Sequence, residues 1–506
     1  MTDLRVVVGS GPNSISVTHA LLERGLQVLM LDIGETLDNG TATVIERMAR
    51  QEPAQWSKAD KTLIQRVDFK TDPGLPPKRI FGSAFPYYLD PKIDAPERML
   101  LYGSHAFGGL STLWGCALLK ASPGDIGDWP AEVRTGITAA YPQIGALLQR
   151  EIGADIFAPG THLKISAAAR QVLVRSERNS GGADCADIYP TPLAISGACK
   201  ACNACAYGCV YGFTYNSRHT IETVFMRNPR FRYAGGVLVE KFREISAGIE
   251  IHTTVGPQRR AEVVLAKQLF LAAGMMGTLR ILWNSGNDVS RVLHARDSSC
   301  ILIPGFIRSL PEFGRAEHHG SSHLSVDLKG IPFERKPAHF QLYFNNPAVA
   351  DAITEKSAAL ASRPVKALVG LANRFLVAGQ GYLHSDFCHR LRLECDSDGT
   401  IRVSVEQNPE NAKYVDTALV QLTKEMRKLG VIFVKRAASI TSYGGSKTAG
   451  ALPHSAQPNR AATDLLGRPY GAQNVFVVDG TVVPAVPARN HTLTMMANAL
   501  RIGQAA

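Results

Sequence analysis

Alternating apolar and polar runs divide the start of the chain into regular elements. Leu4–Val8 is a short apolar run rich in valine, the segment GSGPNS follows it, and apolar residues from Ile15 to Leu22 then recur at helical spacing. A second apolar run, Gln27–Leu31, ends at Asp32. The pattern predicts a strand, a tight turn, a helix and a second strand, which is the order expected in a parallel α/β sheet.

The turn between these elements has the chemistry to bind a dinucleotide. Gly9 permits the turn, and Gly11 lets a pyrophosphate approach the backbone at the helix N-terminus, where N–H groups and the helix dipole favour anions. Ser14 takes the place of the usual third glycine and is small enough for helix and strand to pack closely. Asp32 is placed to accept hydrogen bonds from an adenosine ribose and to repel a 2′-phosphate. FAD or NAD fits this pattern, whereas NADP does not.

The pattern changes character between residues 301 and 443. HFQLYF and RLRLECDSDGTIRVSVE show strand-like alternation, and the Asp-Gly pair in the second predicts a hairpin. We expect an antiparallel sheet here, with NAKYVDTALVQLTKEMRKLG as an amphipathic helix behind it. Four aromatic residues could line a substrate pocket, but at strand spacing such residues are more often in the core: Phe340, Tyr343, Phe344 and Tyr382.

Four segments together resemble the glucose-methanol-choline (GMC) oxidoreductases, flavoproteins that oxidise alcohols. They are VVVGSGPNS with Asp32, HAFGGLSTLWG with the DIGDWP turn, LAAGMMGTLRILWNSG at Leu271–Gly286, and VVDGTVVP…NHTLTMMANALR near the C-terminus. The segments are spread from one end of the chain to the other. The resemblance implies FAD as cofactor and, as its neighbours, Gly108, Gly109, Ser111, Ala273, Gly274, Asp479 and Gly480.

The resemblance also implies a domain organisation. It is an α/β fold in which a Rossmann-type FAD-binding domain is interleaved with an α+β substrate domain built on an antiparallel sheet. We expect the FAD-binding domain at residues 1–130, 221–300 and 444–506, the last carrying active-site residues, and the substrate domain at 301–443, with a cysteine-containing insert and further substrate-domain residues at 131–220. Family members with covalent FAD carry a histidine where this chain has Leu113, so we predict dissociable FAD.

Alcohol oxidation requires a base for the hydroxyl proton, a hydride acceptor, and polar groups around the oxygen. In the family, a histidine or asparagine about eleven residues after the VVD aspartate meets the substrate, and Asn490 and His491 occupy this place. Asn490 also fits the cap of the helix that follows. The family's other histidine precedes the aspartate by some thirty residues, where this chain has Lys447 and Thr448; the nearest imidazole is His454. Our working hypothesis is therefore that His454 is the catalytic base. The alternatives are that Lys447 is the base or that the active site is impaired.

A second chemical signature is the segment ACKACNACAYGCVYG. It has the C-x2-C-x2-C-x3-C spacing of bacterial ferredoxins, formed by Cys199, Cys202, Cys205 and Cys209. The spacing predicts a [4Fe–4S] or [3Fe–4S] cluster, to which Cys185 is an alternative fourth ligand; zinc, unliganded thiols and disulfides stay open. With a cluster the chain would be a dehydrogenase, and without one an oxidase fits equally, so the electron acceptor is undecided. Buried thiols are expected for Cys116, Cys300, Cys388 and Cys395.

Composition narrows the setting of the protein. The 506 residues are 45% hydrophobic and 20% charged, as in globular proteins, and no apolar run is long enough to span a bilayer. The formal net charge of +11 is scattered along the chain, which argues against a nucleic-acid partner. No export segment precedes the first strand, so we expect a cytoplasmic protein. An amphipathic pattern at residues 364–378 indicates either peripheral membrane contact or a helix covering the substrate domain.

The sequence thus predicts an FAD-dependent enzyme that oxidises a small-molecule primary or secondary alcohol to a carbonyl, with hydride transfer to flavin N5. Two interpretations compete with it. One is a flavin- or cluster-binding protein without alcohol chemistry, and the other is an NAD-linked reductase.

Overall fold

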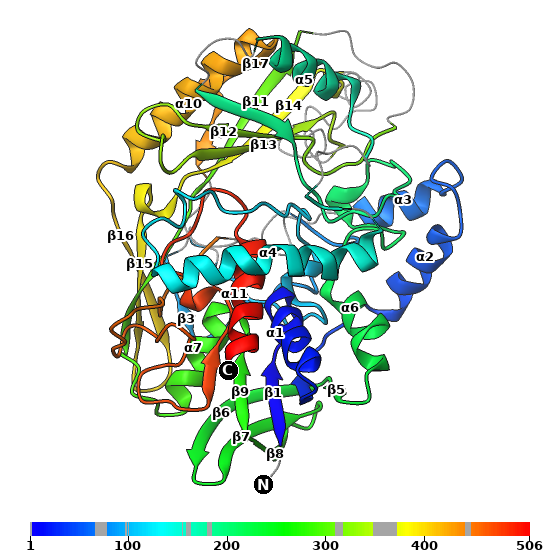
Figure 1. The fold of residues 1–506 in the computed structure, drawn as a ribbon. Helices are drawn as coiled ribbons and strands as arrows, with labels where there is room; N and C mark the ends of the chain where they lie inside the picture. The colour runs from blue at the N-terminus through cyan, green and yellow to red at the C-terminus, as the bar shows by residue number, and fades with distance from the viewer. Residues whose placement is uncertain are drawn as a thin grey trace.

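The computed structural model describes residues 3–65, 78–96, 99, 101–153, 155–157, 163–179, 185–308, 317–347, 372–440 and 447–506. Within these ranges the strands form sheets of five, four, seven and three strands, and helices pack on them (Figure 1). The fold is of the mixed α/β class, as the sequence predicts. The domain boundaries given above stay a prediction.

A parallel sheet joins the two ends of the chain. Its order is β19-β9-β1-β2-β5, and every neighbouring pair is parallel. The strands are β1 (Leu4–Val8), β2 (Gln27–Leu31), β5 (Phe231–Ala234), β9 (Gln268–Leu271) and β19 (Val475–Val477). Strands from the start, the middle and the end of the chain therefore deliver their carboxyl ends to the same edge.

Both faces of this sheet are covered, which explains why its strands are mostly apolar. Val7 points into a core beneath the helices α1 (Pro12–Glu23) and α11 (Thr492–Ala505). These two helices pack on each other, and α11 also packs on α4 (Ala131–Ile152). Val6 and Val8 point into a second core on the opposite face. That face packs against α7 (Gly274–Asn284) and the antiparallel strands β6 (Val237–Ile245), β7 (Gly248–Val255) and β8 (Arg260–Ala266).

A large antiparallel sheet lies at the far end of the molecule from β6, β7 and β8 (Figure 1). Its order is β17-β11-β14-β13-β12-β4, with β18 pairing to β11. The strands are β4 (Ala186–Pro190), β11 (Cys300–Ile307), β12 (Leu324–Leu328), β13 (Ala338–Phe344), β14 (Leu376–Tyr382), β17 (Val431–Phe433) and β18 (Ser439–Ile440). Side chains of α5 (Ala167–Asn179) and α10 (Asn411–Lys428) share its hydrophobic core. The predicted antiparallel sheet and the helix behind it are confirmed.

The predicted hairpin belongs to a separate sheet of order β10-β15-β16-β3. Its strands are β3 (Ile93–Asp94), β10 (Val292–Arg296), β15 (Arg390–Cys395) and β16 (Ile401–Glu406), and β15 pairs with β16 antiparallel. Three further helices are α2 (Asn39–Ala49), α3 (Lys58–Gln65) and α6 (Ser217–Thr223).

The amphipathic segment at 364–378 falls mostly outside the described residues. Its end is not helical, because β14 begins at Leu376. Within the described ranges, no helix combines the length and the apolar character that crossing a bilayer requires.

Candidate active site

A cavity of about 1380 Å³ lies between the carboxyl ends of the parallel strands and the large antiparallel sheet. In open α/β sheets, ligands bind outside the carboxyl ends of the strands, so this is the expected position of a site. Drug-sized ligands occupy pockets of roughly 300–1,000 Å³. The cavity therefore has room for a dinucleotide together with a small substrate.

The glycine turn after β1 lines one end of the cavity. Gly9 has a φ of 98°, and a Cβ there would lie 2.6 Å from the backbone oxygen of Ala272, so the protein itself requires glycine at this position. Gly11 is different, because a Cβ on it would meet no atom within 4 Å. Its backbone faces open space at the N-terminus of α1. The two glycines thus serve separate purposes, the first in chain packing and the second in access to the helix N-terminus.

Asp32 follows β2 and lines the same end of the cavity. Its Oδ2 accepts hydrogen bonds from Ser10 Oγ and, at 3.2 Å, from the hydroxyl of Tyr233. Burial raises the pKa of Asp32 to about 6, against the lowering effect of these hydrogen bonds. A carboxylate is therefore held where a ribose hydroxyl is expected, with part of its hydrogen-bonding capacity already used by the protein.

The second glycine segment packs onto the first. Gly108 and Gly109 have φ values of 100° and 57°, and a Cβ on Gly109 would lie 3.2 Å from the Cα of Gly11. Ser111 Oγ donates to the carbonyl of Gly108 at 2.6 Å and accepts from the backbone N–H of Ser217 at 2.9 Å, so this hydroxyl holds the loop together. Four further predicted cofactor neighbours line the cavity as well, namely Ala273, Gly274, Asp479 and Gly480.

Lys447 lies at the other end of the cavity and is only 5% exposed. Its Nζ donates to the carbonyl of Ala488 and lies 3.6 Å from the centroid of the Tyr382 ring. Burial lowers the pKa of Lys447 to about 7, and the opposing effects of Cys300 and Asp125 are smaller. Near neutral pH this amine is therefore divided between its charged and neutral forms.

Asn490 and His491 line the cavity together with Lys447. Asn490 Oδ1 accepts from Gln341 Nε2 at 3.3 Å, which leaves the Asn490 amide N–H groups as donors. His491, not Asn490, is the cap residue of α11, and no side chain caps the helix. Burial, and after it the neighbouring Lys447, lower the pKa of His491 to about 3. Its buried Nδ1 has no hydrogen-bond partner among the residues that the structure describes.

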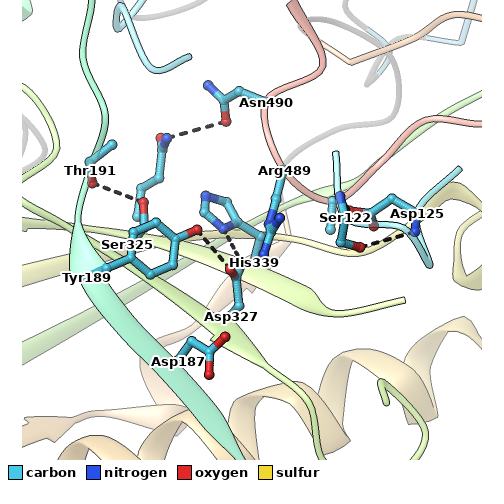
Figure 2. A network of polar contacts seen from close by, with 12 residues as sticks. Ser122, Asp125, Asp187, Tyr189, Thr191, Ser325, Asp327, His339, Arg489 and Asn490 are labelled. Carbon is cyan, nitrogen blue, oxygen red and sulfur yellow. Dashed lines mark hydrogen bonds and ion pairs between the residues drawn. The ribbon is translucent and has the colours of Figure 1, made fainter. Parts of the chain in front are cut away.

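A buried polar network ties the segment that carries Asn490 to the large sheet (Figure 2). Asp327 on β12 accepts from the hydroxyl of Tyr189 at 2.8 Å and from Arg489 Nη2 at 2.6 Å, and it lies 2.8 Å from His339 Nδ1. Burial raises the pKa of Asp327, but the hydrogen bonds and charges of His339 and Arg489 outweigh it and hold this pKa below its usual range. Because Arg489 directly precedes Asn490, the ion pair fixes the position of the amide.

The structure does not place His454 in the cavity. Its Nδ1 lies 2.8 Å from the carbonyl oxygen of Asp464, and its Nε2 lies 3.0 Å from Asn498 Nδ2 on α11. Burial, followed by the charge of Arg501, lowers the pKa of His454 to about 4. Both ring nitrogens are engaged within the protein, so we do not retain His454 as the base. Ser14 is also fully buried, within α1, and is absent from the residues that line the cavity.

The four closely spaced cysteines lie in a loop between two hollows of the molecule. Cys205 and Cys209 line the main cavity, and Cys202 lines a smaller pocket of about 530 Å³. Three sulfur atoms accept backbone N–H hydrogen bonds at 3.3–3.4 Å, the pairs being Ala201 to Cys199, Gly320 to Cys205 and Phe213 to Cys209. Burial, and then the other three thiols, raise the pKa of Cys205, so the four sulfur atoms influence one another.

None of the nine cysteines, all of which are described, forms a disulfide, so that alternative is wrong. Across the described ranges, no group of three or more His, Cys, Asp or Glu side chains is arranged to hold a metal ion. This argues against a zinc site in the loop. The thiols of Cys116, Cys388 and Cys395 are buried, as predicted, whereas Cys300 is half-buried and lines the main cavity.

Part of the sequence and the fold of the whole chain are similar to those of known proteins. Residues 390–499 match the family described as GMC oxidoreductase, and an uncharacterized GMC-type oxidoreductase of Sinorhizobium fredii is 49% identical over 45 residues, 9% of each chain. The matched region is the C-terminal part of the chain, and it carries a GMC oxidoreductase domain. The fold of the whole chain resembles that of pyridoxine 4-oxidase from Mesorbium loti, with a TM-score of 0.64 and 14% identity, over 100% of this chain and 99% of the other.

Two oxidases are similar to this protein over a shorter stretch. They are 6'''-hydroxyparomomycin C oxidase of Streptomyces lividus, 28% identical over 120 residues, and paromamine 6'-oxidase of Streptomyces fradiae, 30% identical over 126 residues. The matched stretches cover 23% and 24% of this chain, and 21% and 23% of the two relatives. The similarity in sequence thus spans less than a quarter of either relative.

Sequence reasoning missed the part of the site that the large antiparallel sheet supplies. Gln341 and Tyr343 on β13, with Gln380 and Tyr382 on β14, line the cavity, although the two tyrosines were expected in the core. Phe340 and Phe344 are in the core, as predicted. The available signal was the alternation along β13, because Gln341 and Tyr343 share one face of the strand and the two phenylalanines share the other.

Proposed function

We propose that this protein is a GMC oxidoreductase that binds FAD and oxidises a primary or secondary alcohol to a carbonyl compound. The observation that carries the proposal is a single cavity with a dinucleotide-type turn and Asp32 at one end, and Lys447, Asn490 and His491 at the other. An adenine dinucleotide laid along the first end would direct its reactive ring toward the second. The short sequence matches to named oxidases and the full-length similarity in fold support the proposal.

The residues at the first end suit FAD. The open space at Gly11 and the N-terminus of α1 would hold the pyrophosphate, and Asp32 would accept from a ribose hydroxyl. Bound flavin would supply the hydride acceptor. The Asn490 amide and His491 Nδ1, which has no hydrogen-bond partner among the described residues, would hold the alcohol oxygen. His491 is buried, and the exclusion of water would strengthen its hydrogen bond.

Anaerobic reduction of the bound flavin by alcohols tests the proposal. Acid treatment of the purified protein should release FAD into the supernatant, since Leu113 replaces the histidine of covalent family members. The loaded protein is then mixed without oxygen with a panel that includes paromamine, pyridoxine, a long-chain alcohol and a sterol. Loss of the yellow flavin absorbance with at least one alcohol is expected. A protein that binds FAD but bleaches with none would be a flavin-binding protein without alcohol chemistry, and bound nicotinamide would indicate the reductase.

The electron acceptor is a separate question that the same preparation answers. An oxidase consumes oxygen during turnover, whereas a dehydrogenase reduces an added dye and leaves the oxygen level unchanged.

We also propose that the loop from Cys199 to Cys209 binds a [4Fe–4S] or [3Fe–4S] cluster. The ferredoxin-type spacing is supported by the three N–H to sulfur hydrogen bonds, an interaction that tunes iron–sulfur clusters. Ala201 and Asn203 have positive φ values of 50° and 59°, a conformation rare outside glycine, and it curls the backbone around the sulfurs. A four-iron cluster is also wider than a single ion, so its sulfur ligands must stand further apart than those of zinc. A bound cluster would exchange single electrons.

Iron and acid-labile sulfide analysis of anaerobically purified protein tests the cluster. We expect stoichiometric iron and sulfide, with a broad brown absorbance beside the flavin bands, and loss of both in Cys205→Ser. The variant Cys395→Ser, whose thiol lies in the hydrophobic core beside β10 and β16, is the matched control and should keep the iron. Purified protein that contains stoichiometric FAD but no iron would disprove the cluster, and it would not affect the proposed alcohol oxidation.

A further inference from the structure

We propose that Lys447 Nζ, in place of the histidine usual in this family, is the base that takes the hydroxyl proton of the alcohol. The inference rests on the proposed alcohol oxidation and assigns its proton-accepting group. Lys447 lines the same cavity as Asn490 and His491, and its charge influences the pKa of His491, so these two side chains lie near each other. His454, the imidazole nearest in sequence, lies outside the cavity with both ring nitrogens engaged.

The surroundings of Nζ are arranged to receive a proton. Among the described residues, no carboxylate lies within ion-pair distance of Lys447 to hold it permanently charged. Two groups are nevertheless ready to stabilise the ammonium once it forms. The carbonyl of Ala488 already accepts a hydrogen bond from Nζ, and the Tyr382 ring lies 3.6 Å away, measured to its centroid. The developing charge therefore meets partners that need no rearrangement.

The electrostatics agree with this geometry. The titratable groups that influence Nζ or are influenced by it are Asp125, Cys300, His339, Tyr382, Cys388 and His491. Burial dominates among these effects and lowers the pKa of Lys447 to about 7, close to the value that makes a general base most effective at neutral pH. His491 is a far weaker base, with a pKa of about 3, and suits a neutral hydrogen-bonding role.

The proposed step balances in atoms and electrons. The O–H bond of the alcohol breaks, and its proton forms a new N–H bond with the lone pair of Nζ. The C–H bond breaks with its electron pair, which passes as hydride to the oxidised flavin of the proposed function, while the carbon–oxygen double bond forms. The alcohol loses two electrons, the flavin gains two, and the proton on Lys447 returns to solvent before the next turnover.

Two variants separate the base from a merely structural lysine. Lys447→Arg keeps the positive charge and a donor for the Ala488 carbonyl, but it cannot accept a proton at neutral pH. Loss of a general base costs about 10²- to 10⁴-fold, so flavin reduction by alcohol should slow by that factor in Lys447→Arg and in Lys447→Met, with FAD content unchanged. In the wild type the rate should rise with pH through about 7 and level off above it, because only the neutral amine accepts a proton. Neither variant should show this rise.

Lys120→Met is the matched control. Lys120 also lies over an aromatic ring, with Nζ 4.1 Å from the centroid of Phe157, but it does not line the cavity. It should reduce flavin at the wild-type rate. If Lys447→Arg also bleaches at the wild-type rate, Lys447 is not the base, although the alcohol chemistry stands. If the wild type bleaches with no alcohol, it is the proposed function that fails.

A measurement without substrate or turnover tests the lysine directly. Trace labelling with acetic anhydride, followed by peptide mass spectrometry over a range of pH, reports the pKa of each lysine. Lys447 should show a midpoint near 7, well below the ordinary lysine value. A midpoint at the ordinary lysine value would overturn the assignment. If both variants of Lys447 fail to fold, this measurement on the wild-type protein still decides.

Discussion

The two ends of the cavity are built in different ways. At the dinucleotide end, each part of the site is a short local motif in which residues close in sequence follow one another from a strand into a turn. At the substrate end, Lys447, Asn490 and Gln341 come from three separate segments and meet only when the large sheet packs against the C-terminal loop. A local motif can be recognised in a sequence because residues at a fixed spacing within one short segment also have fixed relative positions in space. A site assembled from distant segments depends on how those segments pack, and the spacing of residues along the chain does not show this.

The largest effect is expected when one partner of the buried ion pair between Asp327 and Arg489 is removed. Replacing Asp327 by alanine should leave the Arg489 charge unpaired in the interior, and removal of one partner of a buried pair costs about 3–5 kcal/mol. The free energy of unfolding, measured with urea, should fall by that amount. Glu410→Gln, which removes a solvent-exposed ion pair with Lys413, is the control and should change little. Equal stability of the two variants would contradict the network described here.

The same pair predicts how stability depends on pH. The pKa of Asp327 is lowered in the folded protein, so its contribution is fully present above the unfolded carboxyl value of about 4 and is lost as the pH falls through the lower folded value. Acid unfolding curves of the wild type and Asp327→Ala should therefore converge toward low pH. Parallel curves would mean that the carboxylate is not ionised in the folded state.

Asn490 offers the next largest effect, at the site itself. Removal of one hydrogen-bond donor to a developing oxyanion costs about 10²- to 10³-fold in rate, so Asn490→Ala should slow flavin reduction by that factor. Stability should change much less than in Asp327→Ala, because Arg489 and its partner remain. If Asn490→Ala lost as much stability as Asp327→Ala, the amide would act on structure and not on substrate.

Replacing His454 tests the same comparison, because only the position of this histidine in the sequence indicates that it is the base. His454→Ala should cost about 1–3 kcal/mol of stability, since buried polar partners on Asp464 and Asn498 lose their hydrogen bonds. The rate of flavin reduction by alcohol should stay at the wild-type value. A hundredfold slower rate in folded His454→Ala would return this histidine to the mechanism.

Two glycines can be compared at the dinucleotide end, where the expected effects on stability are no larger than that of His454→Ala. Gly9→Ala forces a Cβ against the Ala272 carbonyl at a positive φ, and backbone strain of this kind costs about 1–3 kcal/mol. Gly11→Ala meets no protein atom, so the unfolding of the cofactor-free protein should not change while its affinity for FAD falls. Calorimetry with and without FAD distinguishes the two. Destabilised cofactor-free Gly11→Ala would contradict the open space described at this position.

Much of the fold was predictable because its signals are local. The valine-rich strand, the glycine turn and the following helix lie where the apolar pattern puts them, and the hairpin at β15 and β16 follows from an Asp-Gly pair between alternating runs. The base could not be predicted in this way. His454 and Lys447 are seven residues apart, and only the path of the chain decides which of them turns toward the cavity and which toward α11.

The positions of Tyr343 and Tyr382 could not be predicted for a related reason. Along β13, a pocket face and a core face have the same period of two, so alternation shows that the faces differ without showing which neighbour covers each one. Phe340 and Phe344 lie in the hydrophobic core, whereas Tyr343 and Tyr382 line the cavity, Tyr382 while buried.

The pairing of Asp327 with Arg489 joins residues 162 positions apart in the chain. Anyone who grafts the antiparallel sheet of a relative onto this protein to change its choice of alcohol must therefore transplant the C-terminal segment with it. A chimaera that mixes the two origins would bury a lone guanidinium beside the reaction centre, and its altered selectivity could not be told apart from a displaced Asn490.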